Sequence, residues 1–113
     1  MLETEIETRD SAIWIRIAGR LGASEAPALT EELAKLHEKE QRLLVFDLGK
    51  LEYISSSGLR VFLSIAKRIE AGRDGIAFVG LQDMVRNVFS VSGLDKLFRV
   101  CATEDELGDF GTG

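Results

Sequence analysis

Residues 42–59 decide the fold, and they read RLLVFDLGKLEYISSSGL. The stretch from Arg42 to Leu48 is apolar on both faces at its centre, which is typical of a central strand. A short loop from Gly49 to Ile54 is expected next, leading into three serines and Gly58. A strongly apolar helix is predicted from Leu59 to Glu70, and a glycine-rich stretch ends it. The segment therefore predicts a strand–loop–helix unit of an α/β fold.

Upstream, two strands are predicted in the first 18 residues. Apolar side chains alternate from Ala12 to Ala18, and a weaker alternation runs from Leu2 to Thr8. Arg9, Asp10 and Ser11 form a plausible turn between them, so the two strands should pair antiparallel.

A first helix is expected after these strands. Ser24 is its predicted N-cap, and Pro27 falls in its first turn. His37 lies near its end, is the single histidine of the chain, and is expected to be solvated.

Downstream, strands and helices alternate again. A strand is predicted over residues 76–79, a helix over 82–91, a short helical turn over 94–98, and a last strand at Arg99. We expect residues 1–107 to form one domain and residues 108–113 a flexible tail. The alternation predicts a mostly parallel sheet of four or five strands with an antiparallel N-terminal strand. Helices should pack mainly on one face, leaving Trp14 on the open face.

Charge and composition exclude several classes of function. The 113-residue chain has a net charge of −5, which argues against nucleic-acid binding because such proteins cluster Lys and Arg. No apolar run reaches the length of a membrane helix and no signal peptide is evident, so a cytoplasmic protein without a membrane partner is expected. The single cysteine, Cys101, should be buried in a strand, and no metal or cofactor site is indicated.

The serine cluster is the most informative functional feature. It joins a strand end to a helix start, where binding sites occur in open α/β sheets and where N–H groups and the helix dipole favour anions. The serines could cap the helix only, or one of them could carry a phosphoryl group. A catalytic serine is not indicated, because the chain has neither a Gly-x-Ser-x-Gly motif nor a phosphate-binding loop. We therefore expect no enzyme.

Several motifs together resemble the STAS domain in its bacterial anti-sigma-factor antagonist form. They are Ile17-Ala18-Gly19-Arg20-Leu21, Phe46-Asp47-Leu48, Leu51-Glu52-Tyr53-Ile54, Ser56-Ser57-Gly58-Leu59, Val85-Arg86-Asn87-Val88-Phe89 and Ser92-Gly93-Leu94. The resemblance covers nearly the whole chain and implies the STAS fold.

The resemblance also implies a partner-switching mechanism. An unphosphorylated antagonist binds a serine kinase of the histidine-kinase-like ATPase class, which is also the anti-sigma factor. Phosphorylation, here on Ser56 with Ser55 or Ser57 as alternatives, releases the antagonist, and a PP2C-type phosphatase resets it. The expected partner surface comprises Gly19, Arg20, Leu21, Ser24, Ser55, Ser56, Ser57, Gly58 and Leu59.

Two positions depart from the family pattern. Ser55 stands where the family usually has Asp before the phosphorylated serine, and Gly22 where Asp is frequent. The sequence suggests Asp47 as the nearest remaining acid. We also expect Ser57 to hold the helix start by hydrogen bonding, and Gly58 to allow a kinase to approach closely. The alternative function is a non-switching STAS subunit of a transporter or stress-sensing complex, or a regulator of a non-sigma output.

Overall fold

The computed structural model describes residues 2–9, 12–39, 43–69 and 75–103, without the side chains of residues 36–39, 66, 68 and 69. Its elements follow the chain in the order β1 (Leu2–Arg9), β2 (Ala12–Leu21), α1 (Ala26–Lys39), β3 (Leu43–Ile54), α2 (Ser56–Ile69), β4 (Ile76–Val79), α3 (Asp83–Ser92), α4 (Leu94–Leu97) and β5 (Arg99–Cys101). The predicted α/β class is confirmed.

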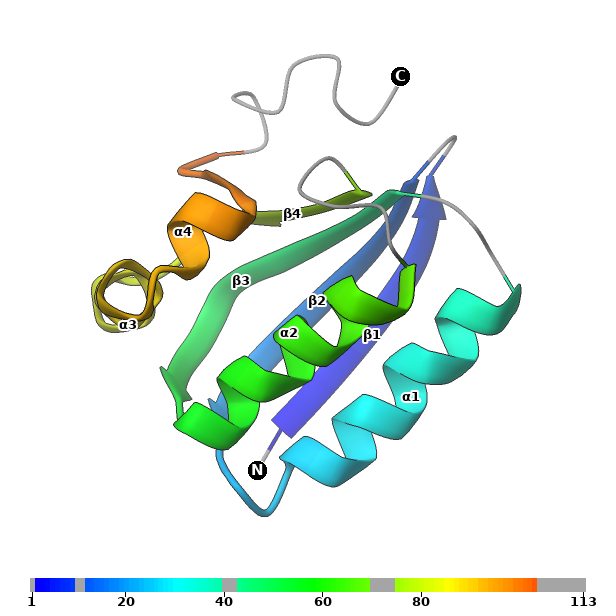
Figure 1. Cartoon of the computed structure of the whole chain (residues 1–113), viewed down its shortest axis with the longest axis horizontal. Helices are drawn as coiled ribbons and strands as arrows, with labels where there is room; N and C mark the ends of the chain where they lie inside the picture. Colours follow the sequence, from blue (N-terminus) through cyan, green and yellow to red (C-terminus); the bar gives the residue numbers. More distant parts are fainter. Residues whose placement is uncertain (1, 10–11, 40–42, 70–74, 104–113) are drawn as a thin grey trace.

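The five strands form one sheet in their sequence order, β1-β2-β3-β4-β5. β1 pairs antiparallel with β2, from Leu2 opposite Gly19 to Arg9 opposite Ala12. The remaining pairs are parallel. Figure 1 shows α1 and α2 in front of the sheet, with the starts of both helices at the end where β2 and β3 finish. The predicted sheet, with its antiparallel N-terminal strand, is therefore confirmed.

Phenylalanine rings fill the space between the sheet and the helices. Phe78 of β4 is at the centre, with ring centroids 5.1 Å from Phe46 of β3, 5.0 Å from Phe62 of α2 and 5.0 Å from Phe89 of α3. All four side chains are fully buried. Such edge and stacked contacts add to the free energy of burying these large apolar surfaces. This cluster fixes α2 against β3 and so positions the start of α2.

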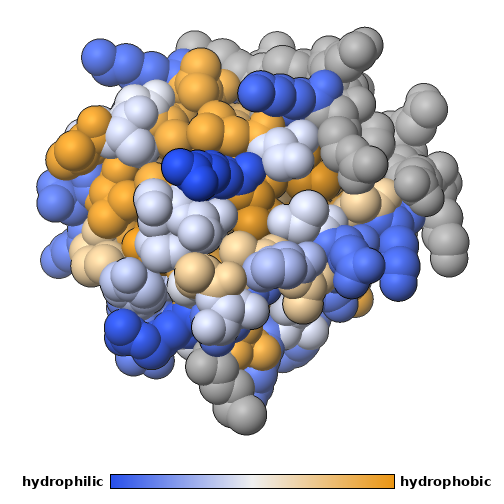
Figure 2. Space-filling view, turned by 60° about the horizontal axis from the view of Figure 1, so that its bottom comes forward, coloured by the Kyte–Doolittle hydropathy of each residue, from blue (hydrophilic) through white to orange (hydrophobic). Residues whose placement is uncertain are grey.

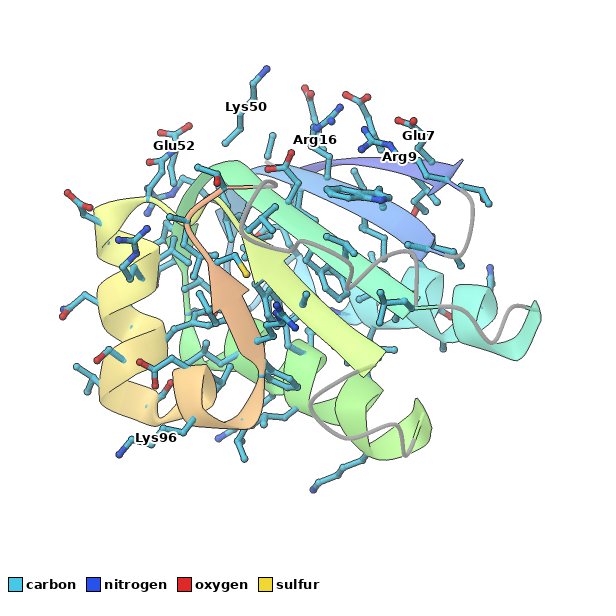
Figure 3. The ribbon with its side chains drawn as sticks, turned by 90° about the horizontal axis from the view of Figure 1, so that it is seen from above. Glu7, Arg9, Arg16, Lys50, Glu52 and Lys96 are labelled. Atoms are coloured by element: carbon cyan, nitrogen blue, oxygen red, sulfur yellow. The ribbon has the colours of Figure 1, made fainter. Side chains whose placement is uncertain are left out.

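The opposite face of the sheet carries a smaller apolar cluster and many charges. Ala12, Val45, Ala77, Val79 and the predicted buried thiol of Cys101 are buried there, with Trp14 packed against them. The guanidinium of Arg9 lies 4.3 Å from the centre of the Trp14 ring. Figure 3 shows Glu7, Arg9, Arg16 and Lys50 on the side away from the helices. Both predictions, helices mainly on one face and Trp14 on the other, are confirmed.

The predicted loop from Gly49 to Ile54 is wrong, because β3 continues as a strand to Ile54. The register between β2 and β3 shifts twice in this stretch, between Arg16 and Ala18 and between Gly19 and Arg20. Each shift adds a residue to β3, as a β-bulge does. The core-facing side chains Leu48, Leu51 and Ile54 are therefore spaced by three residues, and the alternation that identifies a strand is lost.

The predicted N-cap of α1 is also wrong. Ser24 lies exposed in a turn, and the helix starts later, at Ala26. The carbonyl of Gly22 accepts the N–H groups of Glu25 at 3.2 Å and Ala26 at 3.1 Å. The Glu25 carboxylate accepts the N–H of Gly22 at 2.9 Å and so closes the turn. This carboxylate bonds an N–H in the turn ahead of the helix, whereas the Ser24 hydroxyl was expected to accept an N–H of the helix itself.

Three expectations lie outside the described residues. They are the turn at Asp10-Ser11, the solvation of the His37 side chain and the flexible tail over residues 108–113. The division of the chain at residue 107 likewise stays a prediction.

Candidate functional site

The three serines lie at the junction of β3 and α2. β3 ends at Ile54 and α2 begins at Ser56, three residues earlier than the predicted start at Leu59. The N–H of Ser55 donates to the carbonyl of Leu21 at 2.9 Å, which ties this junction to the end of β2. The cluster is therefore held at the carboxyl ends of two neighbouring parallel strands, where α/β folds place their sites.

Ser55 is the cap of α2. Its hydroxyl oxygen accepts the N–H of Gly58 at 3.2 Å, and its carbonyl accepts the N–H of Leu59 at 3.0 Å. The Ser57 side chain is half-buried and makes no hydrogen bond to another described residue. The prediction that Ser57 holds the helix start is therefore wrong, because the residue before a helix is the one whose side chain reaches the N–H three positions on.

Ser56 is exposed as the first residue of α2. The N–H groups of Ser56 and Ser57 belong to the first turn and have no carbonyl partner within the helix. The helix dipole also places partial positive charge at this end. A hydroxyl in this position is accessible, and an anionic group attached to it would be stabilised by these donors. Its modification stays a prediction.

Gly58 is buried where α2 crosses the ends of β2 and β3. A Cβ at this position would lie 2.8 Å from Leu21 Cγ, 2.8 Å from Ile54 Cγ1 and 3.0 Å from the Leu21 carbonyl oxygen. The glycine is therefore required by packing within the chain. Packing thus gives Gly58 a role in the fold, and its expected role in the approach of a kinase stays a prediction.

The structure brings most residues of the predicted partner surface close to one another. The segment from Gly19 to Ser24 adjoins the serines through the Ser55–Leu21 hydrogen bond, but Leu21 itself is fully buried. Arg20 is exposed, with its guanidinium 4.4 Å from the centre of the Tyr53 ring. The accessible surface beside Ser56 thus includes a cation held over an aromatic ring. Sequence reasoning missed Tyr53, because its segment was expected to be a loop.

Glu25 lies closer to the serine cluster than Asp47, the acid that was expected there. Asp47 pairs with Arg16 at 3.2 Å in the middle of the sheet. Arg16 stands five residues before Leu21, whose carbonyl contacts Ser55. Five residues span roughly 16 Å along a strand, so Asp47 lies far from the serines. Glu25 is closer, because its carboxylate is bonded to Gly22, the residue after Leu21. A Cβ on Gly22 would lie 3.2 Å from Glu25 Oε1. Glu25 therefore supplies negative charge at the position where the sequence lacks the usual Asp.

The turn at Gly93 is structural. Gly93 has φ +84° and caps α3 in the left-handed conformation, with its N–H donating to the carbonyl of Ser90 at 3.2 Å. Leu94, which follows, is buried. The interpretation of this turn as a C-cap with a hydrophobic contact is confirmed.

Hydrophobic side chains reach the surface on α2, α3 and α4. Figure 2 brings forward the end of the molecule where α2 starts and shows hydrophobic and strongly hydrophilic groups side by side. Leu59 and Leu63 of α2 are only partly buried, while Val91 of α3 is 81% exposed and Leu97 of α4 is 53% exposed. Mixed surfaces of this kind are suited to protein–protein contact.

The polar side chains of the described residues lie at or near the surface. None of their polar or charged side chains is buried. They include no group of three or more metal-ligating side chains. Among the helices described, none has the length and apolar character needed to cross a bilayer. The arrangement instead presents an exposed hydroxyl on a rigid, well-packed helix start.

Comparison with known proteins shows the family of this chain. The family model of the STAS domain matches residues 3–107. BtrV of Bordetella bronchiseptica is 37% identical over 79% of this chain and 77% of its own. The anti-sigma-B factor antagonist of Listeria monocytogenes is 31% identical over 94% of both chains. The unphosphorylated anti-sigma factor antagonist SpoIIAA superposes with a TM-score of 0.76 and 25% identity, covering 96% of this chain and 94% of its own. The phosphorylated Bacillus SpoIIAA superposes with a TM-score of 0.68 at 22% identity, covering 95% and 97%.

Proposed function

Because this chain belongs to the STAS domain family, we propose that it is an anti-sigma factor antagonist of a partner-switching pathway, controlled by phosphorylation of Ser56. The observation that carries the proposal is the exposure of Ser56 as the first residue of α2. SpoIIAA, which exists in unphosphorylated and phosphorylated forms, has the same fold.

The neighbouring serines are less suitable acceptors than Ser56. The Ser55 hydroxyl is engaged with the N–H of Gly58, and its modification would remove the cap of α2. Ser57 is half-buried. Ser56 is exposed, and its hydroxyl does not cap the helix. A kinase can therefore reach it without unfolding the helix start.

The partner in this proposal is a serine kinase of the histidine-kinase-like ATPase class that also acts as the anti-sigma factor. The unmodified protein binds it through the Ser56 end, including Arg20 and the partly exposed Leu59. A phosphate adds about −1.5 to −2 charges at pH 7. A PP2C-type phosphatase removes it and restores binding.

The protein acts by binding and not by catalysis in this proposal. Serine nucleophiles need an adjacent base. The hydrogen-bond partner of the Ser55 hydroxyl is a backbone N–H, and Ser56 stands exposed at the surface. Neither arrangement would activate a hydroxyl oxygen as a nucleophile.

The test is a kinase reaction followed by a binding measurement. The chain is incubated with its partner kinase, Mg²⁺ and ATP, and the site is assigned by tandem mass spectrometry. Binding of the purified modified and unmodified forms is then compared by calorimetry. We expect one phosphate, on Ser56, and an affinity weaker by about 100-fold or more, because an unpaired charge in a desolvated contact costs several kcal/mol.

Three variants make the result decisive. Ser56→Ala should accept no phosphate and stay bound, whereas Ser57→Ala, a control for serine removal, should still be modified and released. Ser56→Asp should weaken binding only in part, because a carboxylate has less charge than a phosphate. An authenticated kinase partner that leaves the chain unphosphorylated would overturn the switch and favour a non-switching subunit.

A further inference from the structure

β1 is an edge strand with one unpaired side. Its eight residues, Leu2–Arg9, pair only with β2 among the strands described, because β1 stands first in the sheet order. Figure 1 shows β1 at the border of the sheet with α1 running beside it. An edge strand of this length offers a row of backbone N–H and C=O groups to another extended chain.

A groove runs beside this edge, between β1 and α1. Its volume is about 790 Å³, within the range of sites that take ligands. Leu2 and Thr4 of β1 line one wall, and Ala28 and Leu29 of α1 contribute to the other. A strand added to β1 would place every second side chain in this groove, because successive side chains point to opposite faces. Backbone pairing and side-chain contact could thus occur together.

The charge of the groove selects its occupant. Glu25, Glu31 and Glu32 line it, against the single cation Lys35. None of the three carboxylates forms an ion pair with another described residue. Charges around a contact surface favour a partner of opposite sign and repel one of the same sign. An extended segment rich in Lys or Arg therefore complements the groove.

A second copy of this chain fits the edge poorly. Pairing β1 with another β1 would bring Glu3, Glu5 and Glu7 of one copy against the same residues of the other. Like charges opposite one another destabilise a sheet. Glu7 is already paired with Arg9 at 2.9 Å, and Glu5 lies 3.8 Å from Arg16. Glu3 has no such partner among the described residues.

We propose that the β1 edge and the adjoining groove bind an extended, basic segment of a partner protein, which adds to the sheet as a strand beside β1. Addition of a strand supplies main-chain hydrogen bonds for affinity, and the groove reads alternate side chains. Ser56 does not line the groove, although Glu25 at one end of the groove adjoins the turn that contacts the serine cluster.

The test uses three labelled synthetic peptides and the full chain. The first alternates Lys and Val, the second alternates Glu and Val, and the third is the Lys-Val peptide with alternate backbone nitrogens methylated. Affinity is measured by fluorescence anisotropy, and amide hydrogen exchange is followed residue by residue. We expect the Lys-Val peptide to bind at least tenfold more tightly than the others and to protect amides of β1 but not of β5.

Matched charge reversals distinguish the groove from general attraction. Glu31→Lys/Glu32→Lys, at two exposed positions, should weaken binding of the Lys-Val peptide tenfold or more. Asp83→Lys/Asp95→Lys makes the same charge change on α3 and α4 and should have a much smaller effect. Equal losses in both variants, or equal binding of the methylated peptide, would overturn the proposal. Neither result would affect the Ser56 switch.

Discussion

The backbone N–H of Ser55 donates to the carbonyl of Leu21 at 2.9 Å, so the main chain of β2 fixes the start of α2. Ser56, the next residue, is positioned by this contact and not by its own side chain. We therefore expect Ser56→Ala to change the free energy of unfolding by no more than about 0.5 kcal/mol, as is usual for exposed positions. Urea denaturation measures it, and a larger change would mean that loss of phosphorylation in this variant reflects damage to the fold.

Because Ser55 caps α2, its replacement should destabilise the protein more than replacement of the nearby Ser57. Ser55→Ala removes the acceptor of the Gly58 N–H and should destabilise the protein by about 1 kcal/mol. Ser57→Ala, the matched control, should have a clearly smaller effect in the same urea titration. If Ser57→Ala proved the more damaging change, the assignment of the cap would be wrong.

Packing around Gly58 predicts a coupling with Leu21. Gly58→Ala forces a Cβ to within 2.8 Å of Leu21 Cγ and should cost about 1–3 kcal/mol, as overpacking does. The cost should fall by at least about 0.5 kcal/mol in a Leu21→Ala background, because part of the clash is removed.

Gly93→Ala is the matched control for this coupling. Gly93 has φ +84° and no atom within 4 Å of an added Cβ, so its substitution meets backbone strain of about 1–2 kcal/mol but no clash. It should therefore show no coupling to Leu21→Ala. Equal coupling at both glycines would refute the packing explanation.

The sequence predicts best the elements whose apolar residues keep a regular spacing. The strand over Ile76–Val79 and the helix at Asp83–Ser92 lie within one residue of expectation, because continuous apolar runs and 3.6-residue spacing survive there. The β3 extension was not predicted because its two register shifts turn a spacing of two into a spacing of three. No local composition rule distinguishes such a bulged strand from a loop.

In the candidate site, too, some features follow from the local sequence pattern and others do not. The position of the serine cluster at a strand-to-helix junction follows from local pattern, and Ser56 is exposed there as its proposed role requires. Which serine caps the helix depends on where the first turn begins, and the packing around Gly58 depends on Leu21, 37 residues earlier in the chain. The hydrogen bond from the Gly22 N–H to the Glu25 carboxylate was not predicted either, because Ser24 was expected to cap the helix.

The closeness of Gly22 and Glu25 predicts an electrostatic coupling. Gly22→Asp would place a second carboxylate beside Glu25, because a Cβ added at position 22 would lie 3.2 Å from Glu25 Oε1. We expect Gly22→Asp to lower the free energy of unfolding more in the wild-type background than in the Glu25→Gln background. The difference should be about 0.5 kcal/mol or more. The difference should shrink at high salt, since exposed charges are screened. Urea titrations at two ionic strengths measure it, and an unchanged difference would point to a steric cause.

Position 55 allows charge and capping to be tested separately beside the proposed phosphorylation site. Asn and Asp both cap helices well. The free energies of unfolding of Ser55→Asn and Ser55→Asp should therefore each lie within about 0.5 kcal/mol of the wild-type value. Only Asp adds a negative charge next to Ser56. Because like charges repel, Ser55→Asp should slow phosphoryl transfer to Ser56, and Ser55→Asn should leave the rate near that of the wild type. Initial rates with a fixed amount of kinase, measured at low and high salt, test this prediction. The slowing by Asp should lessen as salt rises, whereas an equal slowing by Asn would show that the geometry of the cap, and not its charge, controls the reaction.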